Sequence, residues 1–339
     1  MRKTFQILKL ASSLLRYKIG SPKPIFASYQ LNRRCNKRCI FCDGWKLSDS
    51  KELDTTEAKK VVTHLAEGGV RILGITGGEP TLRTDLEEIG LHAKSEGMIV
   101  AINTNGSLLS LERAKSLTKA FDTIFVSLDG FEETHDSIRG VKGTFRQTML
   151  GISNLLSVRG DCVVGVNFVL TKANVSEFLP LCDYLTSLGI PFSFVPVEGK
   201  PHLALSSQEM KKMAELILAK QKEQPLIGPI AEMIEFMPKF VNGDMPYICD
   251  AGRLYLGVDT VGKAYVCPIG CDHPEQMIGS LVTHPLTELM NGERFYRAMD
   301  SIKSCKPCLA GCTTPYSLLF RSSFRQLARQ IISYYEWCE

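Results

Sequence analysis

The sequence contains no run of 18 apolar residues, so no segment is predicted to cross a membrane as a helix. No secretory signal is predicted either. The first twenty residues are basic, but Lys9, Ser12, Ser13 and Arg16 interrupt their apolar stretch, and no small-residue cleavage site follows. In a chain that is not secreted, the 12 cysteines are expected to be metal ligands or reactive thiols rather than a disulfide framework.

The sequence has no large excess of positive or negative charge, because it contains 40 Lys and Arg and 36 Asp and Glu. A formal net charge of +4 gives no indication of nucleic-acid binding. Histidine is scarce, and the six residues show no spacing typical of a metal site. Neither internal repeats nor low-complexity tracts are present. The 339 residues, 44% of them hydrophobic, are typical of one large or two smaller globular domains, which we expect in the cytoplasm.

Strand-like and helix-like segments alternate between about residues 24 and 200. The strand-like runs are PIFASYQL, VRILGIT, MIVAINT, DTIFVSL, CVVGVNFVL and PFSFVPV. Such alternation indicates parallel strands joined by right-handed helical crossovers. The sequence therefore predicts an α/β fold with a partial (β/α)6 barrel, followed by a small cysteine-rich domain.

The segment CNKRCIFC holds Cys35, Cys39 and Cys42 in the spacing C-x3-C-x2-C. It follows the first predicted strand, at the end of the sheet where ligands of α/β barrels bind. Three thiolates around a [4Fe-4S] cube would leave one iron open to a substrate. Taken alone, the spacing also fits a zinc knuckle that lacks a ligand.

Further motifs follow the next strands: TGGEPTL at 76–82, NTNG at 103–106, VSLDG at 126–130, and then THDSIRG. With the cysteine segment, they resemble the radical S-adenosylmethionine (SAM) superfamily. The resemblance implies that Cys35, Cys39 and Cys42 are the catalytic cluster ligands and that SAM binds the open iron. One electron then cleaves SAM, and the resulting 5′-deoxyadenosyl radical abstracts hydrogen from an unactivated carbon.

The same resemblance implies that SAM is bound by Gly77, Gly78, Glu79, Ser127 and Arg139. Glycines let a backbone approach a ligand closely, and a carboxylate suits the methionine ammonium of SAM. Asn167, on the fifth strand, is a weaker candidate. The alternatives are a simple turn at the glycines, a strand-end cap at Ser127 and a surface charge at Arg139.

A second cysteine group follows residue 245. Cys249, Gly262 and Cys267 match the opening of SPASM and twitch domains, in which Gly262 would form a hairpin turn, and CKPCLAGC at 305–312 resembles their closing group. The resemblance implies one auxiliary [4Fe-4S] cluster. The predicted ligands are Cys249, Cys267, Cys305 and Cys308, with Cys312 able to replace either of the last two and Cys271 as a spare. A zinc ribbon and a second, three-ligand cluster stay open as alternatives.

The predicted organisation has five parts. They are an amphipathic helix at 1–23, the radical SAM core at 24–200, linker helices at 201–245, the auxiliary cluster domain at 246–314 and an amphipathic helix at 315–339. Both end helices pair an apolar stripe with basic residues, which indicates either membrane-surface contact or packing against the barrel.

Three substrate classes are open. A membrane isoprenoid lipid would make the protein peripheral on the cytoplasmic membrane face, whereas a peptide or a small metabolite would not. Sulfatase maturation is disfavoured, because Pro268 stands where such enzymes place an acidic base, with Asp250 as a substitute. We expect a flavodoxin- or ferredoxin-like electron donor and no nucleic acid. A non-enzymatic iron–sulfur or zinc module is the remaining alternative, but it would not need the GGEP motif.

Overall fold

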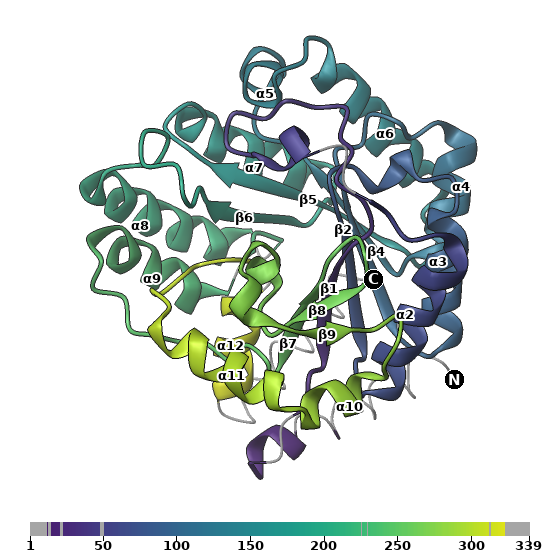
Figure 1. The fold of residues 1–339 in the computed structure, drawn as a ribbon. Helices are drawn as coiled ribbons and strands as arrows, with labels where there is room; N and C mark the ends of the chain where they lie inside the picture. Colours follow the sequence, from purple (N-terminus) through teal and green to yellow (C-terminus); the bar gives the residue numbers. More distant parts are fainter. Residues whose placement is uncertain are drawn as a thin grey trace.

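The structure, a computed structural model, describes residues 12, 15–20, 23–47, 51–224, 226–228, 230–311 and 313–322. Six parallel strands pair in chain order and form a curved sheet (Figure 1). They are β1 Phe26–Gln30, β2 Ile72–Thr76, β3 Ile99–Thr104, β4 Thr123–Ser127, β5 Val163–Leu170 and β6 Phe192–Pro196. Each lies within one of the predicted strand-like runs. The α/β class and the partial barrel are therefore confirmed.

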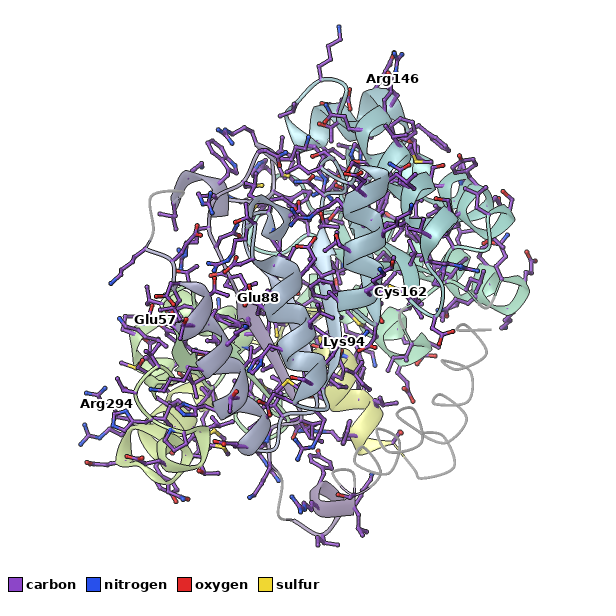
Figure 2. All side chains as sticks on the ribbon, turned by 90° about the vertical axis from the view of Figure 1, so that its right-hand side faces the viewer. Glu57, Glu88, Lys94, Arg146, Cys162 and Arg294 are labelled. Carbon is purple, nitrogen blue, oxygen red and sulfur yellow. The ribbon has the colours of Figure 1, made fainter. Side chains whose placement is uncertain are left out.

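Helices cover the outer face of this sheet (Figure 1). They are α2 Thr55–Glu67, α3 Leu86–Ser95, α4 Leu111–Ala120, α5 Glu132–Arg139, α6 Thr144–Val158 and α7 Phe178–Ser187. Figure 2 shows this helical layer from the side, with Glu57 on α2 and Glu88 on α3. The buried faces of the helices are apolar, as in Val61, Val62 and Leu65 of α2. This packing leaves the ends of the strands open for ligands.

Local sequence signals set several helix boundaries. Asp54 and Glu57 form a capping box at the start of α2, so two backbone N–H groups of the first turn are satisfied. Ser206 and Glu209 form the same kind of capping box at the start of α8 Ser207–Glu223. Gly140 ends α5 in the left-handed region, at a φ of 68°.

Residues 201–245 hold α8 and α9 Ala231–Asn242, and the chain then returns to the barrel. The strands β7 Tyr255–Val258, β8 Lys263–Tyr265 and β9 Met277–Ser280 follow. β7 pairs in parallel with β1, so the cysteine-rich segment extends the barrel sheet instead of forming a sheet of its own. Three helices complete the segment: α10 Leu286–Asn291, α11 Glu293–Ser301 and α12 Thr314–Arg321.

The described parts of the two chain ends lie against each other. The ring of Tyr17 packs edge-on against Phe320 at 5.6 Å, and Phe320 is buried. Most residues of the two predicted apolar stripes, including Phe324 and Leu327, lie outside the described residues. None of the helices that the structure describes is long and apolar enough to span a bilayer.

Two cysteines outside the two cysteine groups belong to the core. Cys162 (Figure 2) lies just before β5, whereas the cysteine loop, residues 31–43, follows the carboxyl end of the parallel strand β1. Cys182 lies on α7. Both are buried, and burial raises the pKa of each thiol to about 12. Neither is therefore a reactive thiolate at neutral pH.

Candidate functional site

The cysteine loop leaves the carboxyl end of β1 and lies beside α5 (Figure 1). Cys39 is buried, Cys35 is half-buried and Cys42 is exposed. None of the cysteines that the structure describes is in a disulfide. The loop therefore presents three free thiols at the mouth of the barrel, where the motifs that follow β2, β3 and β4 also lie.

Gly77 and Gly78 hold one side of this loop. The N–H of Gly78 donates to the carbonyl of Asn32 at 2.8 Å, and the N–H of Glu79 donates to the carbonyl of Arg34 at 2.7 Å. A Cβ at Gly78 would lie 2.2 Å from the Arg34 carbonyl oxygen, and one at Gly77 would lie 2.6 Å from that of Asn32. The close approach that these glycines allow is to the cysteine loop itself.

The end of α5 holds the other side. The N–H of Arg38 donates to the carbonyl of Arg139, and the N–H of Ile40 donates to that of Ile138, both at 2.9 Å. A Cβ at Gly140 would lie 2.5 Å from the Arg38 carbonyl oxygen. The loop is thus fixed by backbone hydrogen bonds on both sides, which limits how far its thiols can move.

The Glu79 carboxylate is buried and fully engaged. Its Oε1 accepts from the N–H and hydroxyl of Thr81 and from the hydroxyl of Thr104, and its Oε2 accepts from the N–H of Asn105 at 2.7 Å. A carboxylate offers about four acceptor positions. Glu79 therefore joins the ends of β2 and β3, and a ligand ammonium would have to share its oxygens with these donors.

Arg139 is buried beside the cysteine loop rather than on the surface. Its guanidinium lies 2.5 Å from the Asp129 carboxylate, 3.7 Å from the Cys39 sulfur and 5.4 Å from the Phe41 ring centre. Burial opposes the charged guanidinium, but Asp129 and Cys39 outweigh it and raise the pKa of Arg139. The VSLDG motif led us to predict Ser127 as a site residue, and Asp129 of the same motif was missed. The arginine of SIRG could have indicated that an acidic partner lies nearby.

Polar residues stand at the ends of three neighbouring strands. Ser127 of β4 is in register with Asn167 of β5, whose amide donates to Asn103 of β3 at 2.6 Å. All three side chains are at least partly exposed. They form a hydrogen-bonding edge close to Asp129, where a polar ligand would fit.

Lys37 is a second residue that the motif reading missed. It lies inside the cysteine segment and is only 2% exposed. Its ammonium donates to the hydroxyl of Thr144 at 2.9 Å and to the amide oxygen of Gln147 at 3.3 Å. The position of a lysine between Cys35 and Cys39 is the signal that the sequence alone offers.

The donor set of the loop fits an iron–sulfur cluster. Fe–S clusters are bound through cysteine thiolates, and this loop provides three of them and no histidine. Burial raises the pKa of the Cys35 and Cys39 thiols, so cluster binding would displace their protons. Among the described residues, no three His, Cys, Asp or Glu side chains are close enough to coordinate one metal ion. This does not argue against a four-iron cube, because each cysteine would bind a different iron of the cluster.

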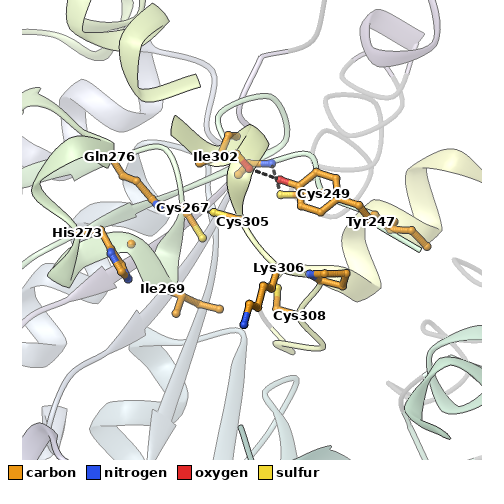
Figure 3. Close-up of a pocket in the computed structure, with 14 residues that line it drawn as sticks. Tyr247, Cys249, Cys267, Ile269, His273, Gln276, Ile302, Cys305, Lys306 and Cys308 are labelled. Carbon is orange, nitrogen blue, oxygen red and sulfur yellow. Dashed lines mark hydrogen bonds between the residues drawn. The ribbon is translucent and has the colours of Figure 1, made fainter. Parts of the chain in front are cut away.

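A second group of cysteines lines a pocket between β8 and the segment after α11 (Figure 3). The four predicted auxiliary ligands, Cys249, Cys267, Cys305 and Cys308, all contribute to its wall. Its volume is about 120 Å³, whereas a single buried water needs only roughly 10–15 Å³. The pocket therefore has room for a group larger than one ion. Burial raises the pKa of the Cys267 thiol to about 11.

Other predictions for this region can be placed. Gly262 forms the hairpin turn between β7 and β8 at a φ of 75°, as predicted. Cys271 lies outside the pocket wall, with its sulfur 3.5 Å from the Pro268 carbonyl, and Cys312 is not among the described residues. The Asp250 carboxylate is buried in an ion pair with Arg321 at 2.9 Å, so it is not placed as a free base.

Comparisons with known proteins agree with this geometry. Residues 29–185 match the model of the radical SAM superfamily. The AdoMet-dependent heme synthase of Methanosarcina barkeri is 32% identical over 84% of this chain and 86% of its own length. The Fe-coproporphyrin III synthase of the same organism is 33% identical over 67% of this chain, which spans only 58% of that relative. The mycofactocin maturase MftC of Mycolicibacterium smegmatis is 25% identical over 79% of this chain and 70% of its own length.

Solved structures share the fold at lower identity. Streptococcus suis SuiB bound to precursor peptide SuiA has a TM-score of 0.68 at 16% identity, over 92% of this chain and 77% of SuiB. Native anSMEcpe with bound AdoMet has a TM-score of 0.65 at 17% identity, over 84% of this chain and 86% of that protein. The motifs, the fold and the relative that is matched along 86% of its own length agree, and the chain belongs to the radical SAM superfamily of enzymes.

Proposed function

We propose that Cys35, Cys39 and Cys42 hold the catalytic [4Fe-4S] cluster, and that the enzyme abstracts hydrogen from a substrate carbon at the barrel mouth. The observation that carries this proposal is the double fixation of the cysteine loop, by Gly78 and Glu79 on one side and by α5 on the other. When bound, the cluster supplies the single electron that cleaves SAM.

The residues around the loop have distinct roles in this proposal. Gly77 and Gly78 position the cysteine backbone, and Glu79 fixes the ends of β2 and β3 where the methionine part of SAM would lie. Ser127 presents its hydroxyl at the mouth for hydrogen bonding to SAM. Arg139, which is paired with Asp129, contacts the Cys39 sulfur and would help to hold it in place where SAM binds.

We further propose that the pocket of Cys249, Cys267, Cys305 and Cys308 holds one auxiliary [4Fe-4S] cluster. Four cysteines, of which Cys305 and Cys308 share one segment, would ligate all of its irons, which favours an electron-transfer role over direct substrate binding. Two four-iron clusters give about eight irons per chain after anaerobic reconstitution. About four irons with one zinc would instead support the zinc-ribbon alternative.

For the substrate, a tetrapyrrole has the strongest support, because the heme synthase relative aligns along 86% of its own length. A peptide is the second candidate. It is supported by the MftC maturase relative and by the fold shared with SuiB, which was solved with a precursor peptide. Binding of each class is measurable by the quenching of the protein's tryptophan fluorescence.

A membrane lipid remains a third candidate. Leu15 and Ile19 of the N-terminal turn are 55% and 69% exposed, as a membrane-contacting surface requires, whereas Phe320 of the C-terminal stripe is buried. Anaerobic flotation with liposomes tests this proposal. If the full chain floats and a chain without residues 1–20 and 316–339 does not, lipid substrates become the first to screen.

The main proposal is tested by SAM cleavage. The anaerobically reconstituted protein is reduced with dithionite, and 5′-deoxyadenosine is measured. We expect cleavage by the wild type and its loss in C39A, whereas C182A, which removes a buried core thiol of α7, retains it. Equal cleavage by C39A would show that the loop does not hold the catalytic cluster.

A further inference from the structure

The buried ammonium of Lys37 has neutral hydrogen-bond partners and an unfavourable setting. The hydroxyl of Thr144 and the amide oxygen of Gln147 carry no charge. Thr144 is the first residue of α6, where the helix dipole places positive partial charge and disfavours a cation. Arg139, a second buried cation, lies on the same side of the loop and also opposes the charge of Lys37.

A buried charge is normally paired, because an isolated ion loses much of its hydration energy. Burial lowers the pKa of Lys37, and the groups that favour its ammonium are Cys35, Glu79 and Cys39. The Glu79 carboxylate is already engaged by Thr81, Thr104 and Asn105. What remains is the negative charge that the thiolates of the cysteine loop would carry when they ligate a cluster.

We propose that Lys37 is a positioning residue that acts as the built-in counter-cation of the catalytic cluster, so that it favours the reduced form. The inference rests on the proposed function. A four-iron cluster with three thiolates is net negative, and one-electron reduction adds a further negative charge. The reduction potential of an iron–sulfur cluster depends on net charge and solvent exposure near it. A fixed cation held by Thr144 therefore stabilises the reduced state.

Redox titration followed by EPR tests this role. The variants are K37M, which removes the charge, K37Q, which can still hydrogen-bond to Thr144, and K37R, which keeps the charge. We expect K37M and K37Q to lower the ratio of reduced to oxidised catalytic cluster roughly tenfold at a fixed reductant potential, a 59 mV shift for one electron. K37R should stay close to the wild type. The auxiliary cluster of the same protein and K94M, a lysine on α3 far from the loop, are the controls.

The outcomes separate this inference from the proposed function. A wild type that binds no catalytic cluster overturns the proposed function, whatever Lys37 does. Unchanged potentials in K37M and K37Q, or an equal shift of both clusters, overturn the counter-cation. If K37M and K37Q fold but lose the catalytic cluster while K37R retains it, the charge is needed for retention and the inference is supported. If folded K37R also loses the cluster, retention depends on the shape of the lysine side chain and not on its charge, and the counter-cation role is overturned.

Discussion

Gly78, in the loop after β2, packs directly against the backbone of the cysteine loop. A methyl group there would lie 2.2 Å from the Arg34 carbonyl oxygen, so one of the two backbones must move. We expect G78A to lose about 1–3 kcal/mol of unfolding free energy and much of its iron. Denaturant unfolding and iron analysis measure both effects.

The control for this variant is G292A, because the nearest atom to a Cβ at Gly292 is at an ordinary 3.4 Å. It should change neither stability nor iron content appreciably. Wild-type iron content in G78A would show that the cysteine loop tolerates displacement, and our account of the glycine pair would be wrong.

The Asp129–Arg139 ion pair is the second residue-scale feature. The Asp129 side chain is completely buried, so removing Arg139 leaves an uncompensated charge. We expect R139M to lose about 3–5 kcal/mol of unfolding free energy, and the double variant D129N/R139M to recover part of it. A double-mutant cycle measured by urea unfolding tests this coupling. Simple additivity of the two single variants would mean that the pair does not interact.

At the scale of one element, α5 depends on a neutral histidine. The Nδ1 of His135 accepts the N–H of Asp129 at 3.0 Å, and burial with the nearby Arg139 lowers the pKa of His135 to about 3. The unfolded chain binds this proton near pH 6.5, whereas the folded chain does not, so stability falls as the pH drops below 6.5.

Between pH 7 and pH 5 this difference amounts to about 2 kcal/mol of unfolding free energy. The variant H135N, whose amide oxygen can accept the same N–H, should lose this part of the pH dependence. Urea unfolding of both proteins at several pH values makes the comparison. Identical pH profiles would show that His135 is protonated in the folded state.

Local sequence signals predicted the strands of the barrel, but they did not predict every pair of neighbouring strands. The alternation of apolar runs predicted all six barrel strands, and the Gly262 turn was predicted because a hairpin joins residues that are close in the sequence. The pairing of β7 with β1 was not predicted. It joins residues more than two hundred positions apart, and no local pattern encodes which sheet edge a later strand will meet.

In the site, too, the residues of local motifs were predicted, whereas contacts between distant segments were not. Motifs identified the cysteine loop and the GGEP turn, because their chemistry is carried by residue types at fixed spacing. The engagement of Glu79 by Thr104 and the pairing of Arg139 with Asp129 depend on which strands lie side by side. The use of Asp250 in an ion pair with Arg321 was likewise invisible before the fold was known.

At the scale of the whole molecule, the shared sheet predicts joint unfolding. β1 is hydrogen-bonded to β2 on one side and to β7 on the other, and one continuous hydrophobic core includes Tyr255 and Leu256 of β7. We expect the barrel and the cysteine-rich segment to unfold in one cooperative transition. Coincident loss of far-UV circular dichroism and of amide protection in β1 and β7 would support this. Two separate transitions would mean that the segment is an independent unit.

The central claim is that the loop of Cys35, Cys39 and Cys42 holds a cluster with one iron open to SAM. The most direct measurement is low-temperature EPR of the reduced, reconstituted C267A/C305A variant, in which the auxiliary site is removed, with and without SAM. Our account predicts a cluster signal that changes when SAM is added. A cluster signal that saturating SAM leaves unchanged, or a variant that binds no cluster while folded, would contradict it.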